Sequence, residues 1–452
     1  MHPAMLEMLK TGETFMRLAC LVLMSLGLAK PAMAVDAITY KGTLGKYPIL
    51  VELASGSDGA LVGRYSYMAK GGDIPLDTMK QSGASVVLAE EAPCGPDSCK
   101  RNDGGDVPDK PVGAHWTLTP SGDGATLTGN WQAVGKSGKP LAIRLERVAQ
   151  RRLPDTVELT PSGIYDSAFR LTYARDSAYS EETAPYEFAK MDVEMQAGPE
   201  ETFEGSVFRY LTDPRSKFAF PRVVSLADGS SPDLVNQALH RRHAMINSQA
   251  FDCLSQIYAG FGGNEHSVGM GPGTLGGFED ENIVMTYLSP TIASWVESGS
   301  TWCGGAHPDN HSSSFALDVR TGEPLAMARV LKDWVATARA TGDSDGSQID
   351  QAAAIGSPGD YHWAAGQPLI DYVIANRVPV DDPTFEAECG IDDLIPTNLA
   401  VRLAPGDQVV FSLEDLPHAI NACAEDLLTV KLKDMPQLLA PTARDYFPAL
   451  AN

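Results

Sequence analysis

The chain has 452 residues and a formal net charge of −23, with 43% hydrophobic and 8% aromatic residues. Such a composition supports a sizeable buried core and more than one ordinary domain. The negative charge disfavours nucleic acid and anionic membrane surfaces as partners and favours basic ones, because like charges repel. The favoured alternative is that the charge serves solubility alone.

The N-terminus predicts export. Met16-Arg17 precedes an apolar run from Leu18 to Leu28, and Ala32-Met33-Ala34 follows as a small-x-small cleavage site. This is the pattern of a secretory signal peptide. The run is shorter than the roughly 20 residues that a membrane-spanning helix needs, so an uncleaved anchor is the less favoured alternative. We expect residues 1–34 to be a signal peptide, with translation starting at Met16, and the mature protein to be periplasmic or secreted, with no membrane span.

Cysteine usage agrees with export. Apart from Cys20 in the apolar run there are six cysteines, and an even number in an exported chain predicts disulfides. Neighbourhood in the sequence suggests three pairs, which are Cys94–Cys99, Cys253–Cys303 and Cys389–Cys423. Metal binding is the alternative, but no CxxC pair occurs. We expect no metal and no cofactor.

Residues 35–150 predict an all-β domain. Short runs with alternating polar and apolar residues are separated by Gly- and Asp-rich turns, which favours an antiparallel barrel or sandwich. The runs are Ile38–Tyr40, Tyr47–Leu53, Leu61–Met68, Ser85–Ala89, Trp116–Thr119, Ala125–Trp131 and Leu141–Leu145. Trp116 and Trp131 are candidates for stacking on sugars, with a place in the core as the favoured alternative.

The remainder predicts a less regular segment and then an α+β domain. Residues 151–214 lack a clear period, and Arg151–Asp155 is typical of a linker. Residues 215–452 predict an antiparallel sheet packed by helices. The clearest helix starts at Ser231-Pro232 and carries an apolar stripe from Leu234 to Ile257 that includes Cys253. A second helix is predicted over Gln367–Asn376.

Four motifs suggest chemistry, and each has a simpler explanation. The glycine-rich stretch Gly260–Gly277 lacks the lysine of a phosphate-binding loop. His307, Asp309 and His311 would share one face of a strand and suit a metal, but Pro308 and Asn310 favour a turn. A Cys303–His307 nucleophile competes with a disulfide for the same thiol. Gly342–Gly346 matches GxSxG, but no apolar strand precedes it.

Three segments together resemble a known family. They are Val284–Ser289, Cys303-Gly304-Gly305-Ala306-His307-Pro308 and Phe315–Leu325, which ends with Arg320-Thr321-Gly322-Glu323-Pro324-Leu325. Their order resembles the extracytoplasmic domain of lysozyme-binding anti-sigma factors, also found in front of some peptidoglycan deacetylase domains. The resemblance covers about residues 215–440, and only the Gly-Gly-Ala-His and Thr-Gly segments are specific. Cys303 departs from the family pattern, and neither a sigma-binding segment nor a deacetylase domain is recognised.

The resemblance implies a non-catalytic envelope module that recognises a protein or wall component. Its binding residues would be Gly304, Gly305, Ala306, His307 and Asp309. We therefore expect an exported cell-envelope binding protein for a basic protein such as lysozyme, or for a peptidoglycan component. The alternative is an envelope hydrolase acting on glycan or peptide, with His307 and Asp309 as the residues to suspect, and a scaffold is a third possibility.

Overall fold

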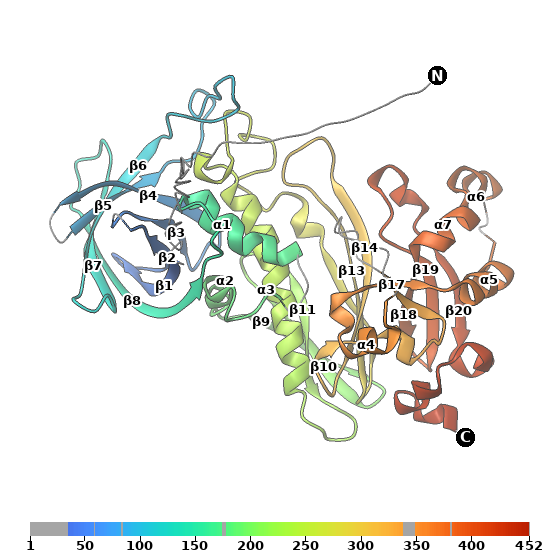
Figure 1. Ribbon diagram of the computed structural model, residues 1–452. Coiled ribbons are helices and arrows are strands. Elements are labelled where there is room, and N and C mark those ends of the chain that lie inside the picture. The colour runs from blue at the N-terminus through green and yellow to red at the C-terminus, as the bar shows by residue number, and fades with distance from the viewer. Residues whose placement is uncertain are drawn as a thin grey trace, which may run out of the picture. The chain divides into compact units, whose positions relative to one another are not determined.

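The computed structural model describes residues 35–57, 59–82, 85–173, 178–337, 349–379 and 382–451. The expected signal peptide and the Gly342–Gly346 motif lie outside the described residues. The fold class predicted from the sequence is confirmed, since an antiparallel barrel is followed by antiparallel sheets with helices (Figure 1). Among the described residues, no helix is both long and apolar enough to cross a bilayer.

Eight consecutive antiparallel strands form the barrel, which closes because the last strand pairs with the first. They are β1 (Asp36–Leu44), β2 (Tyr47–Ser55), β3 (Leu61–Tyr67), β4 (Asp73–Ser82), β5 (Ser85–Glu91), β6 (Val112–Pro120), β7 (Thr126–Ala133) and β8 (Leu141–Arg152). Buried side chains such as Val51, Leu88 and Trp116 fill the interior, as in other small barrels. The sequence did not predict β4, because its polar residues and Pro75 hide the alternation.

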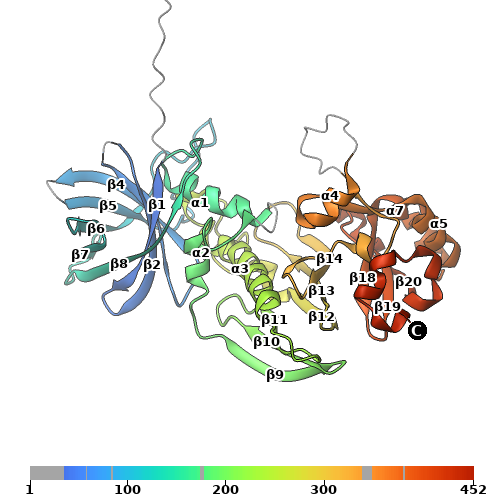
Figure 2. The same ribbon diagram turned by 60° about the horizontal axis from the view of Figure 1, so that its bottom comes forward.

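Segment 151–214, where the sequence shows no clear period and predicts a linker at Arg151–Asp155, consists largely of regular elements. Strand β8 runs on to Arg152, and the rest contains α1 (Pro161–Phe169), α2 (Pro185–Lys190), β9 (Gln196–Phe203) and β10 (Ser206–Thr212). Thr160 caps α1 by accepting a hydrogen bond from the Gly163 backbone N–H. The two helices lie against the outside of the barrel wall (Figure 2).

A buried network of charges joins this wall to its helices. The Arg64 guanidinium lies 2.8 Å from Glu52 on β2, 2.9 Å from Asp73 on β4 and 2.8 Å from Glu187 on α2. Lys190 Nζ lies 2.8 Å from Asp73, and Arg151 Nε lies 2.7 Å from Glu52. Every one of these side chains is buried. The charges are tolerable there because each carboxylate meets at least one cation.

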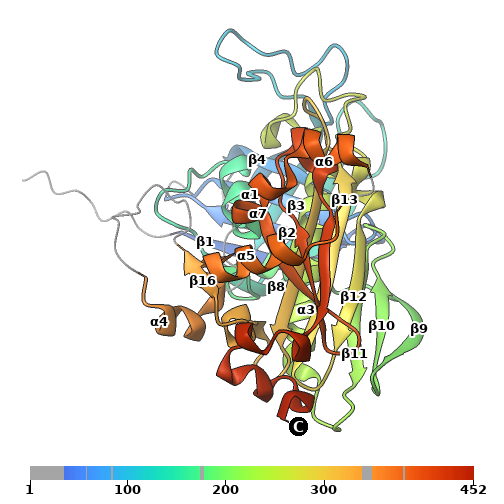
Figure 3. The same cartoon turned by 90° about the vertical axis from the view of Figure 1, so that its right-hand side faces the viewer.

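Two sheets and one long helix follow. Strand β11 (Ala219–Ser225) completes the sheet β11–β10–β9, and the second sheet contains β12 (Asn282–Leu288), β13 (Ile292–Thr301), β14 (Asp309–Asp318) and β15 (Glu323–Pro324). The sheets lie alongside each other (Figure 3), where the Met285 backbone N–H donates to Tyr210 Oη. Helix α3 (Asp233–Ser255) packs Val235, Leu239 and Ile246 into their shared core.

The observed α3 differs from the predicted helix at its start. It begins at Asp233, with Pro232 as the N-cap, and Ser231 Oγ accepts a hydrogen bond from the Asp233 N–H. Leu234, expected on the buried stripe, is 45% exposed. The buried apolar stripe of α3 therefore starts at Val235 and not at Leu234.

A further core surrounds the C-terminal sheet of β18 (Leu399–Ala404), β19 (Gln408–Leu413) and β20 (Asp426–Lys431), and Tyr287 of β12 and Ile292 of β13 also belong to it. The other elements of this part of the chain are β16 (Trp334–Thr337), α4 (Gln351–Gly356), β17 (His362–Ala365), α5 (Gln367–Asn376), α6 (Pro383–Cys389) and α7 (Ile391–Asn398). Helix α5 has the predicted bounds. The disulfide Cys389–Cys423 ties the end of α6 to the 3-10 turn His418–Cys423.

Replacing Arg64 by Met tests the network. The substitution leaves Glu52, Asp73 and Glu187 with fewer cations in a buried site, so we expect a loss of about 3–5 kcal/mol of unfolding free energy. Denaturant unfolding measures this loss. The control is Arg152→Met, which removes the exposed pair with Asp36 and should cost less than about 1 kcal/mol. Equal effects of the two variants would contradict a special role of Arg64.

Candidate functional site

One face of the β13–β14 pair changes from apolar to polar along its length. Near one end the rings of Trp295 and Phe315 stack, with centroids 5.3 Å apart. Further along the same face the paired positions carry Glu297 opposite Ser313, and then Gly299 opposite His311. Because side chains on a strand alternate between faces, all these groups point the same way. One part of this face therefore packs in the core, and the polar part lines a candidate site.

A cavity of about 140 Å³ lies between this polar wall and α3. Its lining combines charged, polar and two apolar side chains, which are Arg242, Ile246, Gln249, Phe278, Glu281, Glu297, Thr301, Asp309, His311 and Ser313. Such a volume accommodates a side-chain-sized group rather than a large ligand, since sites for drug-sized molecules are larger.

An ion pair between Arg242 and Glu297 forms part of the cavity lining. Arg242 on α3 donates to both oxygens of Glu297, with Nε–Oε1 at 2.9 Å and Nη2–Oε2 at 2.7 Å. Trp295 Nε1 also donates to Glu297 Oε1 at 2.8 Å, and the guanidinium lies 4.5 Å from the centre of the Phe315 ring. Bidentate pairing of this kind holds both partners in one geometry. The pair therefore links α3 rigidly to β13.

A second charged pair, His311 and Glu281, also lines the cavity. His311 Nε2 is 2.9 Å from Glu281 Oε2, and the Glu281 side chain is only 5% exposed. The hydrogen bond to Glu281 raises the pKa of His311, and burial opposes this only in part. His311 therefore holds its proton to a higher pH than a free histidine does. Asp309, two residues earlier, is exposed at the edge of the cavity.

The Gly-Gly-Ala-His turn precedes β14 and is held against the glycine-rich segment Gly260–Gly277. Gly304 and Gly305 have φ of 85° and 97°, which glycine adopts at little cost. A Cβ on Gly304 would lie 2.8 Å from the Met270 carbonyl oxygen, so only glycine permits this approach. The Cys253–Cys303 disulfide fixes the turn to the end of α3.

The turn and the first residue of β14 form what we name the turn surface, namely Gly304, Gly305, Ala306, His307 and Asp309, of which all but the half-buried Gly304 are exposed. The His307 ring stacks on His418 with centroids 4.0 Å apart. Val268 and Met270, in the segment packed beside it, are each 45% exposed. The turn surface therefore combines polar groups with nearby apolar side chains on a braced backbone.

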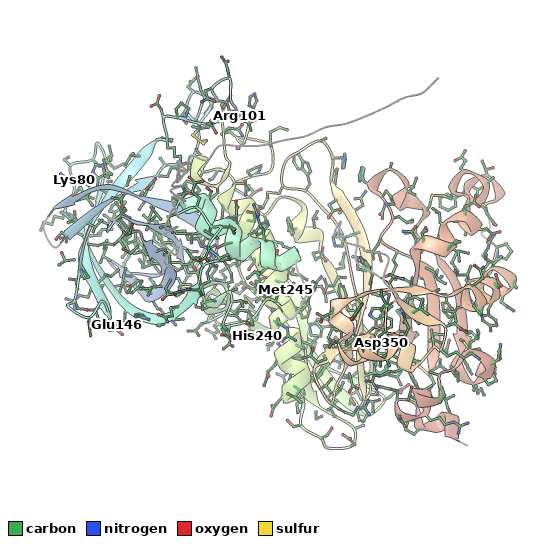
Figure 4. All side chains as sticks on the ribbon, in the orientation of Figure 1. Lys80, Arg101, Glu146, His240, Met245 and Asp350 are labelled. Carbon is green, nitrogen blue, oxygen red and sulfur yellow. A yellow bond between two sulfur atoms is a disulfide. The ribbon has the colours of Figure 1, made fainter. Side chains whose placement is uncertain are left out.

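The barrel loop between β5 and β6 contacts the chain segment that follows α3. The disulfide Cys94–Cys99 closes its base, the Cys94 N–H donates to the Ile257 carbonyl, and the Glu265 N–H donates to the Cys99 carbonyl. Figure 4 labels Arg101, which lies farther along the same loop. Two of the three disulfides therefore brace loops near the turn surface, and all three are the pairs that sequence neighbourhood suggests.

The structure corrects two hypotheses about chemistry. Strand β14 begins at Asp309, so His307 lies in the turn and does not share a strand face with Asp309 and His311. Within the described part of the chain, no three His, Cys, Asp or Glu side chains are arranged to hold a metal ion. Cys303 forms a disulfide with Cys253, so it has no free thiol to act as the nucleophile of a Cys–His pair.

The sugar-stacking hypothesis loses one of its residues. Trp116 is 0% exposed inside the barrel, while Trp131 is partly buried. Both indole N–H groups donate to Glu90 Oε2 at 2.7 Å. Burial raises the pKa of Glu90 although these hydrogen bonds oppose the shift. Trp116 is therefore a core residue.

The sequence did not identify Arg242, Glu281, Glu297 or His418 as site residues. Their neighbours in space are far away in the chain, so no local pattern connects them. Two signals in the sequence could have pointed to the site. Glu297 directly follows the predicted strand Ile292–Val296, and Arg242 lies in the middle of the predicted helix. Comparison with known proteins gives no matching family model and no matching curated protein.

Removing the Cys253–Cys303 bond tests the bracing of the turn. Replacing both residues by Ala opens a loop with a sequence separation of 50, and the chain-entropy model predicts a loss of about 4 kcal/mol. Replacing Cys94 and Cys99, with a separation of 5, should cost about 2 kcal/mol. Denaturant unfolding under non-reducing conditions measures both losses. A larger effect of the short loop would contradict this account.

The His311–Glu281 pair predicts a pH dependence. Because the folded-state pKa of His311 is raised, the stabilisation is fully present below its unfolded pKa of about 6.5 and is lost as pH rises through the folded value. Unfolding free energies measured across this window should show a decline that His311→Gln removes. His362→Gln, at an exposed position on β17, is the matched control. An identical pH dependence in the His311 variant would refute the assignment.

Proposed function

We propose that this chain is a non-catalytic binding protein of the cell envelope, periplasmic or secreted, that recognises a basic protein such as lysozyme or a wall component at the turn surface. The observation that carries the proposal is the braced, exposed turn beside a polar cavity with buried carboxylates. Three disulfides are compatible with an oxidising compartment outside the cytosol.

The charge of the chain supports a basic partner. A net charge of −23 speeds the encounter with a cationic protein over long range. Close to the turn surface, Asp309 is exposed, and Asp415 is also exposed where it accepts a hydrogen bond from Ser313 Oγ. The side chains of Val268 and Met270 add apolar area that a partner covers on binding.

The alternative, an envelope hydrolase using His307 and Asp309, has less support. His307 Nδ1 lies 3.1 Å from the Pro308 carbonyl oxygen, and its ring stacks on His418. Among the described residues, no carboxylate forms a hydrogen bond with the His307 ring. A catalytic histidine is ordinarily oriented by such a partner.

Titration of the purified chain with lysozyme at low and high salt tests the proposal. We expect binding at low ionic strength that weakens with salt, because the attraction between exposed charges is screened. Asp309→Asn should weaken binding about two- to five-fold, the effect of losing one exposed ion pair. Glu323→Gln, at an exposed position on β15 opposite Asp318 at the far end of β14, is the control and should bind as the parent does.

Two further outcomes decide between the alternatives. Absence of lysozyme binding at low ionic strength would refute the basic-protein form of the proposal. Turnover of wall fragments that is lost in a folded His307→Ala variant would favour the hydrolase instead. Retention of insoluble peptidoglycan by a folded chain that does not bind lysozyme would support the wall-component form.

A further inference from the structure

Arg222 on β11 is a desolvated cation without a carboxylate partner. Its Nη1 donates to the Pro221 carbonyl oxygen at 2.8 Å, and its Nη2 lies 3.3 Å from His243 Nδ1 and 3.5 Å from His240 Nδ1. No carboxylate of the described residues lies within ion-pair distance of it. Arg64, Arg151 and Arg215, by contrast, are all buried beside carboxylates.

Arg222 remains positively charged at neutral pH, so it lacks a counter-charge in the protein. Burial lowers its pKa to about 10, which still leaves a cation at neutral pH. Burial and the nearby Arg222 charge lower the pKa of His240 to about 4, and they hold that of His243 well below its usual range. Both imidazoles are therefore neutral at pH 7. They accept hydrogen bonds from the guanidinium but do not neutralise it.

His243 adds a second unsatisfied group. Its side chain is 0% exposed, and its Nε2 has no hydrogen-bond partner. The ring stacks on Phe220 with centroids 5.3 Å apart, and the His240 ring meets the edge of Phe188 at 5.9 Å. Buried polar groups without partners are rare in folded proteins, and such a group is a candidate contact for a bound ion. The protein therefore gives Arg222 three neutral acceptors, with aromatic rings against both histidines.

The site is accessible and separate from its charged neighbours. Arg222 and His240 are both partly exposed, and Figure 4 labels His240 on α3. Arg209, directly opposite Arg222 in the β10–β11 pairing, has its own ion pair with Glu200. Glu200 is therefore engaged elsewhere, and a ligand can approach Arg222 from solvent.

We propose that Arg222, together with His240 and His243, forms a binding site for a small oxyanion, either a carboxylate or a phosphate group. Nη2 is engaged with both imidazoles, so the Nε–H and the second N–H of Nη1 remain to donate to the oxygens of such an anion. The bound anion supplies the counter-charge that the protein does not provide. This site does not depend on the function proposed for the turn surface.

Thermal unfolding of the full purified chain tests the site, with inorganic phosphate and acetate as probes and chloride at matched ionic strength as the reference. An anion at about ten times its Kd should raise Tm by roughly 1–2 °C. Arg222→Met should abolish this response. It should also have a higher Tm than the parent without added anion, because it removes an uncompensated buried charge.

Two variants keep the test decisive. Arg222→Lys retains the charge but has three N–H donors in place of five, so its response should be weaker than that of the parent. Arg209→Met removes a neighbouring, paired arginine and should respond as the parent does. No response of the parent to either anion, or an equal response in Arg222→Met, would overturn the proposal. If Arg222→Met fails to fold, an undiminished response in Arg222→Lys overturns it instead.

Discussion

Arg64 is the group on which the arrangement of the chain depends most. Its guanidinium meets carboxylates from β2, β4 and α2, so one side chain joins the barrel wall to the helix that covers it. Asp73 extends the connection, because its carboxylate accepts from Tyr186 and its N–H donates to Ser255 Oγ at the end of α3. Helix α3 in turn carries Arg242 and Cys253 to the polar cavity and the turn. The network thus positions the candidate site although it lies far from it in the sequence.

The same network shows how a strongly acidic chain keeps charge inside. Burial alone would raise the pKa of Glu52, but Arg151 and Arg64 lower it to about 2. Burial raises the pKa of Asp73 despite Lys190 and Arg64, while Lys190 and Arg64 hold that of Glu187 below its usual value. Three acids and three bases balance there. The surplus of negative charge is therefore left for the surface, where it acts on partners at long range.

The sequence predicted what depends on local patterns and missed what depends on distant contacts. Alternation predicted most barrel strands, and period predicted α5 over Gln367–Asn376. Strand β4 was missed because one of its polar residues, Asp73, serves the buried network rather than solvent. The turn Gly304–His307 was recognisable as a motif. Its neighbours Glu281 and Arg242 were not, because a helix and a strand separated by dozens of residues must first pack together.

Helix α3 places two arginine environments next to each other, and their difference carries the argument about ligands. Arg242, on the helix itself, faces β13 and is held by both oxygens of Glu297. In the same turn of the helix, His240 and His243 face β11 and meet Arg222, which has only neutral acceptors around it. A chain with 58 acidic residues has ample means to place a carboxylate beside a buried arginine, and it does so for Arg64, Arg151 and Arg215. Because two neutral imidazoles stand beside Arg222 in place of a carboxylate, its positive charge is left to be balanced by an anion from outside the chain.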